Sequence, residues 1–153
     1  MELNKETKEL DKIMRDIHKY LVEYTKNNLK EYNLTKARFL VLWYISKNQP
    51  INMSSLHKKM YMANSTLTVI VDKLVDLKYV KRYRNPDDRR EVLIELTEYG
   101  DDKLCKILHI RQSFLQKALD NSNIDEQKEL INLLKPILIN LENSFKEGDE
   151  SNE

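Results

Sequence analysis

The residues best suited to binding chemistry in this sequence are small polar and basic side chains between residues 64 and 90. From Lys78 to Arg90 there are six basic residues and two acidic ones, a local balance of +4 in a chain whose net charge is +1. Such a local excess of positive charge attracts a polyanion. Just before this segment stand small polar side chains, which can approach a surface closely and bond to base edges or phosphates. They are Asn64, Ser65, Thr66 and Thr68. Together the two segments predict nucleic-acid binding.

Catalytic and cofactor chemistry is not indicated. The three histidines, His18, His57 and His109, are scattered, and no cluster of His, Cys, Asp and Glu has the spacing of metal ligands. The two glycines, Gly100 and Gly148, lie far apart, so no Gly-rich phosphate loop is present. No Ser/His/Asp order suggests a catalytic triad. We therefore expect no enzyme activity, no metal and no cofactor.

Length and composition indicate a soluble protein of the cytoplasm. A chain of 153 residues suits one domain with helical extensions. Its single cysteine, Cys105, cannot form an internal disulfide, which favours a reducing compartment. The longest apolar run, Phe39 to Ile45, is much shorter than the roughly 20 residues of a membrane span. We expect a cytoplasmic location and no membrane partner.

Helical periodicity dominates the chain up to residue 78. Residues 5–30 carry one apolar stripe, which must pack against another apolar surface. A second helix should begin after Thr35, a good N-cap, and be buried nearly all round. Asn52 is a plausible cap for a short third helix through Met60, and a fourth helix is expected over 64–78.

The hydrophobic period then changes from 3.6 to 2. Residues 79–84 and 92–96 are predicted strands, and Asn85 to Asp88 have turn chemistry, so the two strands form a β-hairpin. A fifth helix should follow Thr97 as its cap, and a last helix should begin after a break at 120–123. The fold class is therefore mainly α with a small β-hairpin.

Helix, helix, helix and hairpin in this order define a winged helix-turn-helix with helical extensions at both ends. In this motif the second helix of the pair lies in the major groove of DNA. Arginines at the hairpin tip suit a narrow minor groove, where the negative potential is enhanced. Double-stranded DNA is the expected partner.

Three stretches carry a family resemblance. Asp88 to Gly100 resembles the wing signature of the MarR family, D-x-R followed by an alternating strand and L-T-x-x-G. Leu34 to Leu42 resembles the family's second helix, and Ser55 to Leu74 resembles its helix-turn-helix. The resemblance implies a homodimeric regulator, often a repressor, that binds a pseudo-palindromic operator and can be released by a small aromatic or phenolic ligand.

The same resemblance implies a division of the chain and a set of DNA contacts. It implies an N-terminal dimerisation helix (1–33), a DNA-binding domain (34–100), C-terminal dimerisation helices (101–147) and an acidic tail (148–153). It places Arg90 in the minor groove, gives Asp88 the task of positioning the wing arginine, and directs Arg89 and Lys73 to phosphates. The recognition-helix positions are Asn64, Ser65, Thr66, Thr68 and Val69.

Departures from the family pattern give further expectations. Tyr61 and Lys78 stand where the family usually has glycine, so Lys78 is expected in a left-handed conformation at some strain. Ala63 replaces the usual Ser or Thr cap of the recognition helix, and Asn64 is expected to cap it instead. Val69 takes a place that is often arginine.

Several alternatives stay open. The aromatic side chains of the first two helices could line a ligand pocket between the first, second and fifth helices, or simply form core. They are Tyr20, Tyr24, Phe39, Trp43 and Tyr44. The winged helix could also bind protein or RNA, or the chain could be a dimeric effector-binding protein with no DNA role.

Overall fold

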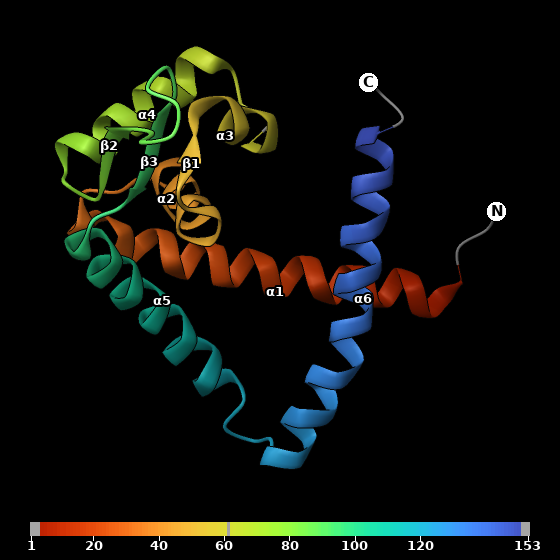
Figure 1. Cartoon of the computed structure of the whole chain (residues 1–153). Coiled ribbons are helices and arrows are strands. Elements are labelled where there is room, and N and C mark those ends of the chain that lie inside the picture. Colours follow the sequence, from red (N-terminus) through yellow and green to blue (C-terminus); the bar gives the residue numbers. More distant parts are fainter. Residues whose placement is uncertain (1–3, 61, 151–153) are drawn as a thin grey trace. The chain divides into compact units, whose positions relative to one another are not determined.

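The computed structural model describes residues 4–60 and 62–150, and within them the chain is mainly helical (Figure 1). Tyr61 and residues 151–153 of the expected acidic tail lie outside the described residues. The elements are α1 (Lys5–Leu29), the short 3-10 helix η1 (Lys30–Tyr32), α2 (Lys36–Asn48), β1 (Ile51–Asn52), α3 (Met53–Met60), α4 (Asn64–Asp76), β2 (Val80–Arg84), β3 (Val92–Leu96), α5 (Glu98–Ala118) and α6 (Ile124–Glu150). The predicted mainly helical fold with one hairpin is confirmed.

The chain forms two compact units, residues 1–114 and 115–153. The first unit holds α1 to α4, the three strands and most of α5, and it contains the winged helix-turn-helix. The second unit consists of the end of α5 and the long helix α6, which contains Pro136. None of the helices in residues 4–60 and 62–150 is both long and apolar enough to cross a bilayer.

Side-chain caps determine where three of the helices begin. Thr35 Oγ1 accepts a hydrogen bond from the backbone N–H of Arg38 at 3.3 Å, and Asn52 Oδ1 accepts one from Ser55 at 2.7 Å. Thr97 Oγ1 accepts from Gly100 N–H at 2.9 Å. Each bond satisfies a backbone donor that has no partner within the helix. The three predicted caps are confirmed.

The predicted cap of α4 is wrong. Ala63 occupies the N-cap position, with φ −57° and ψ 138°, and no side chain caps the helix. Asn64 is already the first helical residue, one position past the N-cap, and its side chain makes no capping hydrogen bond. The backbone carbonyl of Asn64 accepts a hydrogen bond from Thr68 Oγ1 at 2.9 Å.

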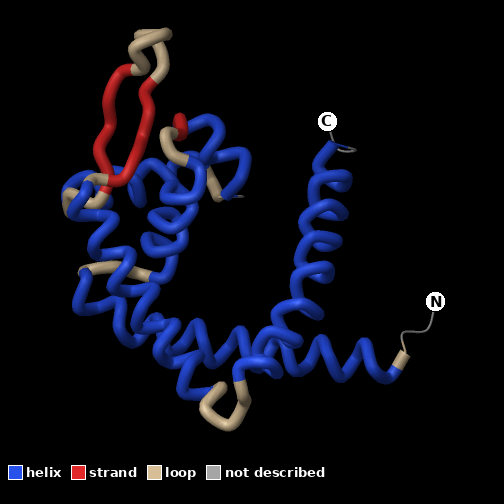
Figure 2. Tube along the Cα trace, turned by 60° about the horizontal axis from the view of Figure 1, so that its bottom comes forward, coloured by secondary structure: helices blue, strands red, loops and turns tan. Residues whose placement is uncertain are grey.

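The hairpin is part of a three-stranded antiparallel sheet with the order β1-β3-β2. Val80 pairs with Leu96 and Arg84 with Val92 along the hairpin. On the other side of β3, Ile51 pairs with Ile94 and Asn52 with Leu93. Sequence analysis missed β1 because a two-residue strand has no period to detect. In Figure 2 the turn between β2 and β3 stands clear of the helices of the same unit.

The core of the first unit joins the helix-turn-helix to the sheet. Its buried side chains come from all five helices of the unit, α1 to α5, and from the three strands. They include Val41, Leu42, Ile45, Leu56, Leu67, Val71, Leu74, Ile94, Leu104 and Ile107. Four buried residues of α4 (Leu67, Ile70, Val71, Leu74) fix which face of this helix points outward.

A left-handed residue ends α4. Lys78 has φ 61°, as predicted, and donates its N–H to Val75 O at 2.8 Å, while Tyr79 N–H donates to Leu74 O at 2.9 Å. This is a Schellman motif, which usually has glycine at the left-handed position. A side chain there costs energy, because its Cβ approaches the carbonyl oxygen.

Replacing Lys78 with glycine should therefore stabilise the protein. We expect a gain of about 0.5–1 kcal/mol, since relief of the left-handed strain exceeds the extra entropy that glycine loses on folding. Urea unfolding with an unchanged slope would measure it. The control is Lys58→Gly, inside α3, which should lose about 1 kcal/mol. A Lys78→Gly protein no more stable than wild type would contradict the assigned conformation.

Candidate nucleic-acid interface

Helix α4 presents a polar face opposite its buried stripe. Asn64, Ser65, Thr66, Thr68 and Val69 are all exposed, Val69 to 66%. Lys73 is half-buried one turn further along, and its Nζ lies 3.9 Å from Asp76 Oδ2. The five predicted recognition-helix positions and Lys73 thus lie outside the buried face of α4, where a partner molecule can reach them.

The N-terminus of α4 offers backbone donors. With no side-chain cap, the N–H groups of its first turn have no acceptor from the N-cap side chain. The Thr68 hydroxyl proton is directed to Asn64 O at 2.9 Å, so this side chain presents lone pairs and a methyl group outward. A helix N-terminus with free donors favours a phosphate group.

The turn between β2 and β3, residues 85–91, carries the wing arginines. Arg89 and Arg90 are exposed, and neither side chain has an ion pair within the described residues. The turn backbone is held by Asp88, whose Oδ1 accepts from Arg90 N–H at 2.9 Å, and by Arg84, whose Nη1 donates to Arg89 O at 2.8 Å. The loop is therefore ordered by its own bonds while its two tip guanidinium groups remain available.

One ion pair connects the hairpin to the recognition helix. Arg82 Nη1 lies 2.6 Å from Asp72 Oδ1, with the two side chains 31% and 51% exposed. At this exposure the pair adds at most about 1 kcal/mol to stability, so its effect is mainly on orientation. Sequence analysis did not pair these residues, because they lie in different elements whose contact depends on how the helix packs against the hairpin.

A cleft lies where α3, α4 and the hairpin meet. It has a volume of about 620 Å³. Its lining residues are Met53, Ser54, His57, Asn64, Thr68, Arg82 and Val92. The cleft brings two predicted recognition residues, Asn64 and Thr68, beside the hairpin strands.

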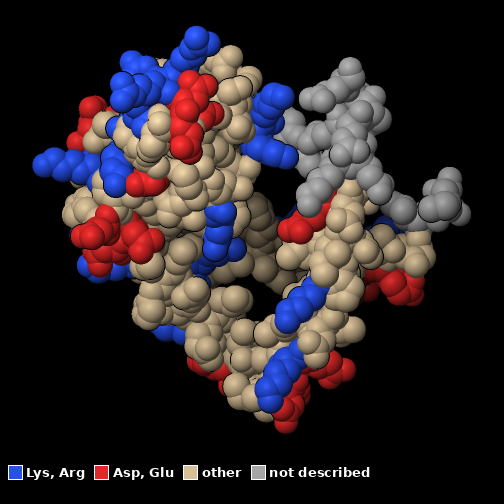
Figure 3. Space-filling view, in the orientation of Figure 1, with Lys and Arg blue, Asp and Glu red and all other residues tan. Residues whose placement is uncertain are grey.

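In Figure 3, Lys and Arg side chains gather over α4 and the hairpin, with some acidic side chains between them. The recognition helix and the wing thus share one surface.

A charged cluster lies on the hairpin strands behind the wing turn. Lys81 Nζ lies 2.8 Å from Glu95 Oε1, and Tyr83 Oη donates to Glu95 Oε2 at 2.9 Å. The hydrogen bonds from Lys81 and Tyr83 lower the pKa of Glu95, and the bond to Glu95 raises the pKa of Lys81. The negative charge of the Glu95 carboxylate is therefore balanced by partners within the sheet.

This cluster predicts an acid-dependent contribution to stability. A carboxyl whose folded-state pKa is lowered stabilises the fold only while it is ionised. Wild type should melt at a higher temperature than Glu95→Gln at neutral pH. The difference should shrink as the pH falls below 4.5, the ordinary value for glutamate, and disappear below the folded-state pKa. The control is Glu9→Gln, an exposed position on α1. A Glu95 difference that does not change with pH would contradict the assignment.

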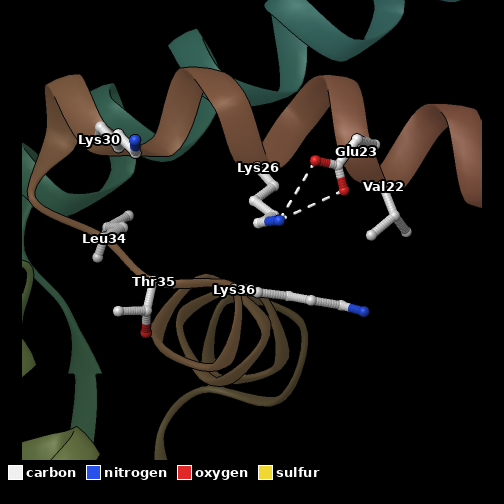
Figure 4. Close-up of a pocket in the computed structure, with 7 residues that line it drawn as sticks. All are labelled: Val22, Glu23, Lys26, Lys30, Leu34, Thr35 and Lys36. Carbon is white, nitrogen blue, oxygen red and sulfur yellow. Dashed lines mark hydrogen bonds and ion pairs between the residues drawn. The ribbon is translucent and has the colours of Figure 1, made fainter.

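The five aromatic residues proposed for a ligand pocket have different surroundings. Tyr24 stacks on Phe114 of α5, with ring centroids 3.9 Å apart. Tyr20 is 62% exposed and Trp43 38%, whereas Phe39 and Tyr44 pack against the core. A separate cavity of about 430 Å³ lies between α1 and α2 (Figure 4). It is lined by Val22, Glu23, Lys26, Lys30, Leu34, Thr35 and Lys36, and by none of the five aromatic residues.

The recognition helix, the arginine-bearing turn and the sheet together define a winged helix-turn-helix protein. The family model that matches the chain is that of the MarR family, over residues 34–92. The regulator SarZ of Staphylococcus haemolyticus, an HTH-type transcriptional regulator, is 32% identical over 114 residues, which are 73% of this chain and 75% of SarZ. The chain belongs to the MarR family.

Two solved structures have the same fold. A MarR family protein from Bacillus stearothermophilus superposes with a TM-score of 0.81 and 26% identity, over 92% of this chain and 99% of its own. The multiple antibiotic resistance repressor MarR gives a TM-score of 0.70 and 28% identity, over 84% and 94%. The protein is a DNA-binding transcriptional regulator of MarR type and is not an enzyme.

Proposed function

We propose that this protein is a repressor that binds a pseudo-palindromic operator as a homodimer in the cytoplasm. The observation that carries the proposal is the cleft that the exposed face of α4 shares with the hairpin strands, whose connecting turn carries the exposed wing arginines. An exposed recognition helix can enter the major groove while the wing reaches the adjacent minor groove. Repression follows when the bound protein occupies a promoter, and one solved relative carries the name of a repressor.

The DNA contacts follow from the positions of the side chains. Arg90 enters the minor groove, Arg89 and Lys73 contact phosphates, and Asp88 holds the turn through Arg90 N–H. The polar residues Asn64, Ser65, Thr66 and Thr68, with Val69, face the bases or the backbone of the major groove. Phosphate contacts give the complex its position and base contacts give it specificity.

Exposed apolar side chains support the homodimer. On α1 these are Leu10, Ile13, Met14 and Ile17, each 40–50% exposed. On α6, Leu130, Ile131, Leu133, Leu134, Leu138 and Leu141 are also exposed. Contiguous apolar surface of this kind marks an interaction site. Residues 1–33 and 101–147 then form the dimer around the DNA-binding domain (34–100), and a two-fold axis sets the recognition helices roughly 34 Å apart.

Release by a small aromatic or phenolic ligand is the regulatory part of the proposal. The stacked rings of Tyr24 and Phe114 join α1 to α5, and a flat ligand could insert beside them. A ligand shifts the DNA affinity only if it binds one arrangement of the dimer better than the other. Titrating the protein–DNA complex with 4-hydroxybenzoate tests for release. Unchanged DNA affinity would remove this ligand from the proposal.

Sedimentation of the protein alone and with duplex DNA tests the assembly. The proposal predicts a dimer in solution and two protomers on each operator duplex. A monomer that binds no duplex at low salt would contradict it. That result would favour the alternative of a winged helix that binds protein or RNA.

A further inference from the structure

Glu91 lies at the junction between the wing turn and the helix-turn-helix. It is the last residue of the turn, directly before β3. Its Oε1 accepts a hydrogen bond from Asn52 Nδ2, and its Oε2 accepts one from Asn85 Nδ2 at 2.6 Å. All three residues are half-buried. One carboxylate therefore joins β1 to the first residue of the wing turn.

Each asparagine is held in one orientation by a second bond. Asn52 Oδ1 accepts from Ser55 N–H at 2.7 Å, which caps α3, and Asn85 Oδ1 accepts from Asp87 N–H at 3.0 Å. Rotating either amide by 180° would place an NH₂ group against a backbone N–H. Both asparagines must therefore present NH₂ groups to residue 91. Only a side chain with two acceptors and no donor satisfies both, which is what a carboxylate supplies.

The backbone of the same residue closes the turn. Glu91 N–H donates to Asp88 O at 2.9 Å, and Asn85 N–H donates to Glu91 O at 2.9 Å. The turn between these bonds carries Arg89 and Arg90. A continuous chain of hydrogen bonds thus runs from the N-terminus of α3 through Asn52 and Glu91 to the wing turn.

We propose that Glu91 is a positioning residue that fixes the direction of the wing arginines relative to the helix-turn-helix. The proposal deepens the proposed function and rests on it, because it assumes that the wing contacts DNA. Positioning of the wing arginines by Glu91 should strengthen DNA binding. Electrostatics alone predicts that Glu91 weakens DNA binding, since a carboxylate close to DNA repels phosphates. Whether DNA affinity falls or rises when Glu91 is neutralised therefore distinguishes a positioning role from a simple charge effect.

The first test measures DNA affinity of Glu91→Gln against Asp87→Asn. Both remove one negative charge from the same turn, but the Asp87 carboxylate has no hydrogen bond within the described residues, whereas an amide at 91 sets a donor against an asparagine NH₂. We expect roughly tenfold weaker binding for Glu91→Gln, as for loss of a charged hydrogen bond, and equal or tighter binding for Asp87→Asn. Tighter binding in both variants would overturn the proposal.

A rescue variant makes the test specific. Adding Asn85→Asp to Glu91→Gln restores the net charge and reverses one bond, because the new carboxylate accepts from the new amide and still accepts from Asp87 N–H. Binding should return to within about twofold of wild type. In an Arg90→Ala background Glu91→Gln should cost less affinity than it does in wild type, because only Arg89 is left for it to position. Absence of rescue, or fully additive losses, would contradict action through the wing.

A readout without DNA keeps failure of this proposal distinct from failure of the proposed function. Backbone ¹⁵N relaxation of the free protein should show lower order parameters for the amides of Arg89 and Arg90 in Glu91→Gln than in wild type. The α4 amides should not change. If wild type binds no DNA, the proposed function fails while this comparison still tests the positioning. Unchanged order parameters in the turn would overturn it.

Discussion

Gly100→Ala is expected to destabilise the protein by about 3 kcal/mol, even though alanine favours helices. A Cβ at this position would lie 1.9 Å from Tyr79 O and 2.7 Å from Tyr79 C. Both are backbone atoms, so no side chain can rotate away. The same carbonyl accepts a hydrogen bond from Thr97 N–H at 3.1 Å, which ties the end of β3 to the start of the hairpin. The first turn of α5 must therefore shift away from Tyr79.

Chemical unfolding followed by circular dichroism measures this effect. The matched control is Glu98→Ala, an exposed position in the same helical turn, which should stay within about 0.5 kcal/mol of wild type. A Gly100→Ala protein with the stability of wild type would show that α5 does not pack against Tyr79 in this way.

Arg90→Ala is expected to have the largest effect on DNA binding. Its side chain is exposed at the wing, and its backbone N–H is already bonded to Asp88. Truncation should therefore remove a DNA contact without disturbing the turn. We expect a loss of about 1–2 kcal/mol of binding free energy and a salt slope that is lower by about one.

The control for charge is Lys36→Ala, an exposed position at the start of α2 that makes the same change in net charge outside the wing and the proposed dimer segments. If both variants weaken binding equally, net charge and not the wing contact is responsible. If Arg90→Ala binds as wild type does over the whole salt series, the assignment of the wing is wrong.

Local signals in the sequence predicted most of the fold. Apolar periodicity located the helices, and the caps Thr35, Asn52 and Thr97 marked three helix starts within one or two residues. The family's glycine at the position of Lys78 predicted a left-handed residue, and the structure shows it. These features depend on neighbours a few residues away, which is why they can be found without a structure.

Features that depend on distant contacts could not be found in this way. Strand β1 exists because it pairs with β3, some 40 residues later, and the Glu91–Asn52 bond joins positions 39 residues apart. The start of α4 at Asn64 was predicted correctly, but its cap was not, because Asn64 is a good cap in isolation and here is the first residue of the helix. The predicted recognition residues lie on the outward face of α4, and their DNA contacts stay predictions.

Fluorescence anisotropy of the purified protein with duplex DNA tests the central claim most directly. The duplex comes from just upstream of the protein's own coding region, and a scrambled duplex of equal length and composition is the comparison, each over a series of salt concentrations. We predict tighter binding to the upstream duplex, two protomers on each site and a steep fall in affinity with salt. No binding to either duplex at low salt would contradict the claim that α4 and the wing form a DNA-binding surface.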